Sequence, residues 1–329
     1  MSVYRKILAI GGLATLLLLP YLLDLLGQEY LLSLATRILI YGLAASSLNL
    51  ILGYGGMVSL GHAAFMGIGG YTVAILAFHS SESSTLFAWL PFTGTENGLI
   101  AWPLAMVLAA LFGLLTGAIC LRTKGMHFIM ITLAFAQMVY FFFGSLDSYG
   151  GGDGLVIYNR SLLPGLALNN DRTFYYLCLI ILLAFLYLFH RLIKARFGRV
   201  LIGCRENRQR IQVLGFSTFG YRLLSYCLAG SAAGLAGALL ANQGEFVSPG
   251  MMHWTRSGEI LVMVLLGGMG TLAGPLVGAA ALLFLEEYLA MYTEHWMVIL
   301  GPFLIIVVLF ARGGLYGLLL RRGSNERND

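Results

Sequence analysis

The side chains with the clearest chemistry lie in one basic stretch, GRVLIGCRENRQRIQVLG, at residues 198–215. Arginine guanidinium groups bind carboxylates and phosphates through a fixed fork of N–H donors. Glu206 and Arg210 are four residues apart and Gly215 supplies a stop, which predicts a short helix here. Two uses remain open. A surface helix on anionic lipid would need one broad apolar face, whereas a helix presented to a protein would offer its arginines and glutamines to carboxylates.

Residue patterns for catalysis and metal binding are missing from the chain. It contains no G-x-x-x-x-G-K-[ST] phosphate loop, no H-E-x-x-H and no G-x-S-x-G. The 6 histidines and 4 cysteines lack the spacing of metal ligands. We therefore predict that the chain is not an enzyme and that it binds no metal or cofactor itself.

Uncharged polar side chains are scattered through otherwise apolar stretches. Such groups can line a path for a polar solute, or they can form interhelical hydrogen bonds worth about 1 kcal/mol each. His62 has the best claim to a path, because the glycines and alanines of SLGHAAFMGIGGYT leave room around it. We predict Ser59, His62, Thr132 and Gln137 as pathway residues. Arg37 is expected to snorkel outward, and we find no charged site suited to a strongly ionic solute.

The surrounding composition is that of a membrane protein. The chain is 59% hydrophobic and 11% charged, with a mean hydropathy of +0.83. Several stretches of about 20 residues are almost free of charge, long enough to cross the hydrocarbon core as helices. Spans are predicted near 7–27, 31–52, 56–78, 100–121, 126–146, 173–193, 223–243, 257–274, 276–293 and 295–311.

The fold predicted from these spans is an all-α transmembrane bundle of about ten helices that forms a single domain, 1–329. One long cytoplasmic loop, 194–222, carries the basic stretch. The stretch GGMGTLAGPLVGAAA leaves open whether 257–281 crosses the membrane fully or is re-entrant. Two long polar loops, at 79–99 and 147–172, are either docking surfaces or plain connectors.

The positions of lysine and arginine set the predicted orientation. With ten spans, most of them fall on one side, which the positive-inside rule makes cytoplasmic and which then holds both termini. Only Arg160, Arg172 and Arg256 fall on the opposite side. The net charge of +5 is therefore explained by topology and predicts no nucleic-acid partner.

A short internal repeat accompanies a high glycine content of 42 residues. GGMVSLG at 55–61 and GGMGTLA at 267–273 share a glycine pair, methionine, a hydroxyl residue and leucine in register. Duplicated halves are common in transporters, where glycine-interrupted helices meet at the site. A chance match is equally compatible with a glycine-rich chain.

Five segments carry a resemblance to a known family. They are LNLILGYGGMVSLGHAAFMGIGGY (48–71), MITLAFAQMVY (130–140), GGDGL (151–155), FGRVLIGCRENRQRIQVLGF (197–216) and TRSGEILVMVLLGGMGTLAGPLVGA (255–279). In these segments and their order the chain resembles the permease subunits of bacterial branched-chain amino acid ABC importers, particularly the LivM type.

The resemblance implies a multi-pass permease of the bacterial inner membrane. Its expected partners are a second permease, two ABC ATPase subunits that bind ATP and Mg, an extracytoplasmic solute-binding protein and membrane lipid. It also implies that the loop from Arg205 to Leu214 is the coupling helix that seats in the ATPase. The residues expected to couple are Arg205, Glu206, Arg208, Gln209 and Arg210.

The predicted function is inward transport of branched-chain amino acids, driven by ATP hydrolysis on the separate subunits. Related permeases carry urea, short amides or other amino acids, and the quoted motifs do not separate these substrates. Two functions of a different class stay open: an ion-coupled secondary carrier or channel that works alone, and a structural membrane scaffold.

Overall fold

The computed structural model describes residues 3–25, 27, 29–82 and 93–292, together with 295, 298, 301–302 and 314–317. This part of the chain is mostly helical. Its α-helices are α1 (Val3–Leu25), α2 (Glu29–Asn49), α3 (His62–Ser81), α4 (Gly98–Cys120), α5 (Met126–Gly144), α6 (Asp171–Lys194), α7 (Arg196–Glu206), α8 (Arg208–Val213), α9 (Thr218–Gly244), α10 (Trp254–Gly267) and α11 (Gly274–Ala290). A π-helical turn covers Leu50–Tyr54, and 3-10 turns cover Asp147–Tyr149 and Pro249–Met252.

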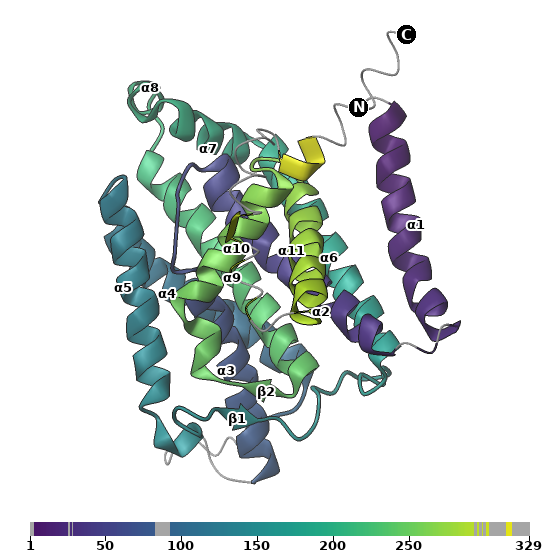
Figure 1. Ribbon diagram of the computed structural model, residues 1–329. Coiled ribbons are helices and arrows are strands. Elements are labelled where there is room, and N and C mark those ends of the chain that lie inside the picture. Colours follow the sequence, from purple (N-terminus) through teal and green to yellow (C-terminus); the bar gives the residue numbers. More distant parts are fainter. Residues whose placement is uncertain are drawn as a thin grey trace.

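The bundle has two distinct ends (Figure 1). Helices α7 and α8 lie at one end, called here the α8 end. The opposite end, called the β end, carries a small antiparallel sheet of β1 (Leu155–Val156) and β2 (Phe246–Val247). Helix α1 begins at the α8 end and stands at the side of the bundle, where Tyr175 and Tyr176 of α6 donate hydrogen bonds to its backbone.

Nine of the predicted spans overlap helices of the structure, from α1 to α6 and from α9 to α11. Among the described residues, 6 helices are long and apolar enough to cross a membrane. Five of these are α3, α4, α5, α6 and α9, and the sixth is α2 together with the π-helical turn that follows it. The chain is thus a multi-pass membrane protein, and the number of ten spans stays a prediction.

The span predicted at 56–78 starts later than expected, because α3 begins at His62. After the π-helical turn, residues 55–61 leave the helical path. Gly56 adopts φ +65°, a conformation that glycine reaches freely and that strains other residues. Apolar composition continues through this segment, so hydropathy alone could not locate the break.

A second break separates α10 from α11. Their lengths of 14 and 17 residues correspond to about 21 and 26 Å at the helical rise, short of a hydrocarbon core of roughly 30 Å. The helices at the spans predicted near 257–274 and 276–293 are therefore each shorter than a complete crossing.

The stretches GGMVSLG and GGMGTLA occupy equivalent places in the fold. Each joins the end of one helix to the start of the next, α3 in the first case and α11 in the second. Their second glycines, Gly56 and Gly268, have φ of +65° and +114°. Their last residues, Gly61 and Ala273, have φ/ψ of −93°/7° and −92°/−11°. A match in conformation thus accompanies the match in sequence and supports a duplicated unit.

The core of the bundle is formed by α9, which packs closely against α3 and α4. Small residues make this approach possible. A Cβ on Gly237 would lie 1.8 Å from the carbonyl oxygen of Met66, and one on Gly69 would lie 1.9 Å from that of Gly234. Backbone therefore contacts backbone where α3 and α9 cross, as small residues allow between membrane helices.

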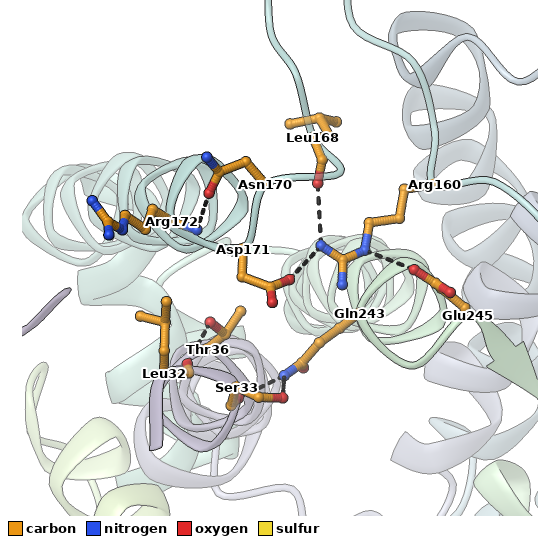
Figure 2. Close-up of polar contacts among 10 residues, drawn as sticks. All are labelled: Leu32, Ser33, Thr36, Arg160, Leu168, Asn170, Asp171, Arg172, Gln243 and Glu245. Carbon is orange, nitrogen blue, oxygen red and sulfur yellow. Dashed lines mark hydrogen bonds and ion pairs between the residues drawn. The ribbon is translucent and has the colours of Figure 1, made fainter. Parts of the chain in front are cut away.

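The β end is held by Arg160, whose side chain is only 12% exposed. Its Nη1 lies 2.6 Å from Asp171 Oδ1 and its Nε lies 3.2 Å from Glu245 Oε1, as Figure 2 shows. Nη1 also donates to the backbone oxygen of Leu168 at 3.2 Å. These contacts join the start of α6 to the end of α9. They give Arg160 a structural role on the side of the membrane where the positive-inside rule predicts few basic residues.

Several predictions fall outside the residues that the structure describes. They are most of the span at 295–311, the middle of the loop at 79–99 and the basic C-terminal residues on which the predicted position of that terminus depends.

Candidate functional site

The basic stretch forms two helices where one was predicted. Helix α7 ends at Glu206, and Asn207 has the extended backbone of an N-cap, with φ −152° and ψ 99°. Its Oδ1 accepts a hydrogen bond from the backbone N–H of Arg210 at 3.0 Å, which starts α8. Glu206 and Arg210 therefore belong to different helices, and not to the single short helix that their spacing predicted. Gly215, at φ +85°, ends α8 as predicted.

Two of the predicted coupling arginines form hydrogen bonds with other elements of the chain. Arg205 Nη1 donates to the backbone oxygen of Gly53, in the π-helical turn that ends α2. Its stem covers Gly56, where a Cβ would lie 2.7 Å from Arg205 Cγ. Arg208 Nε donates to Thr218 Oγ1, at the start of α9, at 3.2 Å. The α7–α8 unit is thereby attached both to α9 and to the first helix break.

The outward surface of this unit is partly apolar. Glu206, Gln209 and Arg210 are exposed, as expected for contact residues. Beside them lie exposed apolar side chains, which we call the α8 tip: Val213 at 88%, Leu214 at 63% and Phe216 at 42% exposure. Protein interfaces combine apolar cores with arginine. The α8 tip therefore has the character of a docking surface, which the charge pattern of the sequence did not reveal.

Thiol labelling can test this surface. Burial raises the pKa of the Cys204 thiol, which is only 8% exposed. Because the thiolate is the reactive form, we expect a cysteine at the tip, Val213→Cys, to react with a maleimide at least about tenfold faster than Cys204 at neutral pH. Peptide mass spectrometry of labelled membranes measures both rates. Equal rates in membranes stripped of peripheral proteins would contradict the exposure of the α8 tip.

The two helix breaks are connected through α2. Asn49, which is 3% exposed, donates from Nδ2 to the backbone oxygen of Thr271 at 2.8 Å. Its Oδ1 accepts from the backbone N–H of Gly270 at 2.9 Å. Asn49 thus joins the end of α2 to the second break, and Arg205 joins the π-helical turn after α2 to α7. These hydrogen bonds form a continuous set of contacts from α7 to both breaks.

Three of the predicted pathway residues gather around the first break. Ser59, His62 and Thr132 are 0%, 0% and 1% exposed. The Thr132 hydroxyl accepts from the backbone N–H of Leu60 at 3.3 Å, and His62 Nε2 lies 2.7 Å from Ser47 Oγ. One hydrogen bond joins α5 to the first break and the other joins α3 to α2, so all three side chains are buried in packed contacts in this structure. Their pathway role stays a prediction.

The fourth predicted pathway residue, Gln137, lies farther along α5 and has a buried Nε2 without a hydrogen-bond partner among the described residues. None of the four lines a cavity of mixed polar and apolar character that the described residues form. That cavity has a volume of about 430 Å³ and lies among α2, α3, α9, β2 and the start of α10. Its polar lining includes Arg37 and Arg256, neither of which was predicted as a site residue.

A bundle of apolar helices with two helix breaks joined through Asn49, and with a partly polar cavity elsewhere among its helices, is built like a membrane permease, the class that moves solutes between its own helices. Comparison with known proteins agrees with this class. A family model described as the permease component of the branched-chain amino acid transport system matches residues 30–309. The chain belongs to this family.

Relatives of known name match along most of this chain. The permease protein LivM of the high-affinity branched-chain amino acid transport system of Salmonella typhimurium is 26% identical over 309 residues, which cover 86% of this chain and 69% of LivM. A probable LivM permease of Methanocaldococcus jannaschii is 25% identical, covering 85% and 88% of the two chains. Salmonella typhimurium LivH is 24% identical, covering 84% and 91%. No solved structure matches the chain.

Proposed function

We propose that this chain is one permease half of an ABC importer that carries branched-chain amino acids inward. Hydrolysis of ATP, with Mg, takes place on two separate ATPase subunits. The α8 tip seats on one of them, and the other half of the pore is a second, related permease. An extracytoplasmic solute-binding protein delivers the substrate at the β end.

The contact between Arg205 and Gly53 carries this proposal. It joins a helix pair with an exposed, partly apolar tip to the end of α2, where Asn49 then holds the second break. A force applied at the tip therefore acts on both interrupted helices. Rigid helices with two discrete arrangements are the physical means by which motion passes between distant sites.

The family supports the substrate and the partners. The family is described as the permease component of the branched-chain amino acid transport system. The chain is similar both to LivM and to LivH of Salmonella typhimurium, two permeases of one named system, which supports pairing between two related subunits. Neither these relatives nor the family description concerns urea, amides or an ion-coupled carrier.

The orientation follows from the basic residues. The connection between α4 and α5 lies at the α8 end together with α7 and α8 (Figure 1). These segments carry Arg122, Lys124 and the arginines of the basic stretch, so this end faces the cytoplasm under the positive-inside rule. The β end then faces outward from the bacterial inner membrane, toward the binding protein.

The first test is purification of this chain from its native membrane in mild detergent, followed by reconstitution. We expect a second permease and an ATPase with a phosphate loop to copurify, and the complex to take up leucine only with ATP and loaded binding protein. Leucine uptake by the chain alone, driven by an ion gradient, would contradict the proposal.

A variant tests the coupling role of Arg205. Arg205→Ala removes a charge-assisted hydrogen bond of roughly 1.5–3 kcal/mol and should lower uptake and binding-protein-stimulated ATP hydrolysis at least about fivefold. Copurification of the ATPase should persist, because the exposed tip is unchanged. Lys124→Ala, an exposed cation between α4 and α5 at the same end, serves as the matched control. If uptake and stimulated ATP hydrolysis are the same in R205A as in K124A, Arg205 has no part in coupling ATP hydrolysis to transport.

A further inference from the structure

The cavity of about 430 Å³ has the size and mixed lining of a small-molecule site. Ligand pockets commonly measure roughly 300–1,000 Å³ and combine apolar walls with a few polar groups. Met66, Leu240 and Met251 supply apolar surface, and Arg37 and Arg256 supply positive charge. The cavity extends along α2 from Ser33, near the β end, to Tyr41, about two helical turns deeper in the bundle.

Arg37 is the unusual member of this lining. It lies in a membrane-spanning helix, where a charged side chain is costly and marks a functional site by default. Its guanidinium carbon is 5.7 Å from the centre of the Tyr41 ring, and within the described chain it forms no ion pair with a carboxylate. A guanidinium in this setting can bind an anionic group of a ligand with two parallel hydrogen bonds.

Charges of the opposite sign accompany the arginines. Arg256 Nη1 lies 2.8 Å from Glu259 Oε2, and Glu286 of α11 interacts electrostatically with both Arg37 and Arg256. Gln243 adds a neutral acceptor, because its Nε2 donates to the backbone of Ser33 while its buried Oε1 has no hydrogen-bond partner among the described residues (Figure 2). Positive and negative groups thus lie together beside an apolar wall.

We propose that this cavity is a binding site for the zwitterion of a branched-chain amino acid on its way through the permease. Arg37 and Arg256 bind the carboxylate, the Gln243 carbonyl oxygen accepts from the ammonium, and Met66, Leu240 and Met251 pack against the branched side chain. The proposal rests on the proposed function and adds the place and chemistry of recognition. It also separates substrates, since urea and amides lack the carboxylate that two guanidinium groups select.

The test uses the complete importer, with its partner subunits, in proteoliposomes supplied with ATP and leucine-loaded binding protein. Arg37→Gln and Arg256→Gln should each lower the maximal rate of leucine uptake at least about tenfold. ATP hydrolysis should change by less than about twofold, and the half-saturating leucine concentration should stay the same, because the binding protein captures the solute. Arg37→Lys keeps a cation and should recover part of the rate.

Two further variants keep the outcome decisive. Arg191→Gln alters an exposed arginine at the far end of α6 and should leave uptake unchanged. Met251→Trp fills the cavity without touching a charge and should lower uptake as the glutamine variants do. Full uptake by Met251→Trp, or by both glutamine variants, would overturn the proposal. If the wild-type complex takes up no leucine, the proposed function itself has failed. If the wild-type complex takes up leucine and the variants do so equally well, only the proposal that the cavity binds the substrate has failed.

Discussion

Gly237→Ala should prevent the native packing of α3 against α9 and yield little folded protein. The added Cβ would lie 1.8 Å from the carbonyl oxygen of Met66, so two helix backbones must separate. Overpacking of a core commonly costs about 1–3 kcal/mol, and because the obstacle here is backbone, which cannot rotate away, we expect about 3 kcal/mol or more. The yield of monodisperse complex in detergent and its thermal unfolding midpoint measure the effect.

Gly220→Ala provides the matched control in the same helix. Its Cβ would meet only the Ser217 hydroxyl, at 3.6 Å, an ordinary contact. Alanine favours a helix over glycine by about 1 kcal/mol, so this variant should equal or exceed the wild type in stability. A Gly237→Ala protein with wild-type yield and unfolding midpoint would show that α3 and α9 do not cross as closely as described.

Asn49→Leu should destabilise the complex by about 2–4 kcal/mol and reduce ATP-driven leucine uptake severely. The substitution keeps the side-chain volume similar but leaves the N–H of Gly270 and the C=O of Thr271 without their partner. A buried polar backbone group left unpaired costs about 1–3 kcal/mol. Because Asn49 joins α2 to the second break, uptake should fall even at temperatures where the variant complex stays folded.

Asn170→Ala is the comparison for Asn49. Asn170 is exposed and accepts one hydrogen bond, from the backbone N–H of Arg172 at 3.0 Å, as the N-cap of α6. Its loss should cost about 1 kcal/mol and leave uptake near the wild-type level. Equal uptake by the Asn49 and Asn170 variants would argue against a role of the second break in transport.

Local sequence patterns predicted much of the helical framework. Apolar runs placed α4, α5 and α6 within a few residues, because a membrane helix must satisfy its own backbone and needs a fixed length of apolar side chains. Hydropathy failed where the helix is interrupted inside the apolar region. At 55–61 the residues are as apolar as a span, and it is Gly56 and the contact with Arg205 that end the helical path.

At the candidate sites, too, local features could be predicted from the sequence, whereas contacts between distant residues could not. Asn207 and Gly215 are local signals that delimit α8 wherever the helix is placed. Arg37 looked like a residue that snorkels, since a single span gives it no neighbours. The cavity arises only because α9 and α10 bring Gln243 and Arg256 beside it from more than 200 residues away in the sequence.

By itself the sequence determined that this chain is an apolar multi-pass membrane protein, that its basic residues cluster in a few loops, and, through its motifs, to which family it belongs. These properties follow from composition, short-range periodicity and local residue order. Only the tertiary structure decided where the helices break, that Asn49 binds the second break and Arg205 the turn after α2, and which charged groups share a cavity. Contacts between residues distant in the chain depend on how whole helices cross, and the close approach at Gly69 and Gly237 sets that crossing.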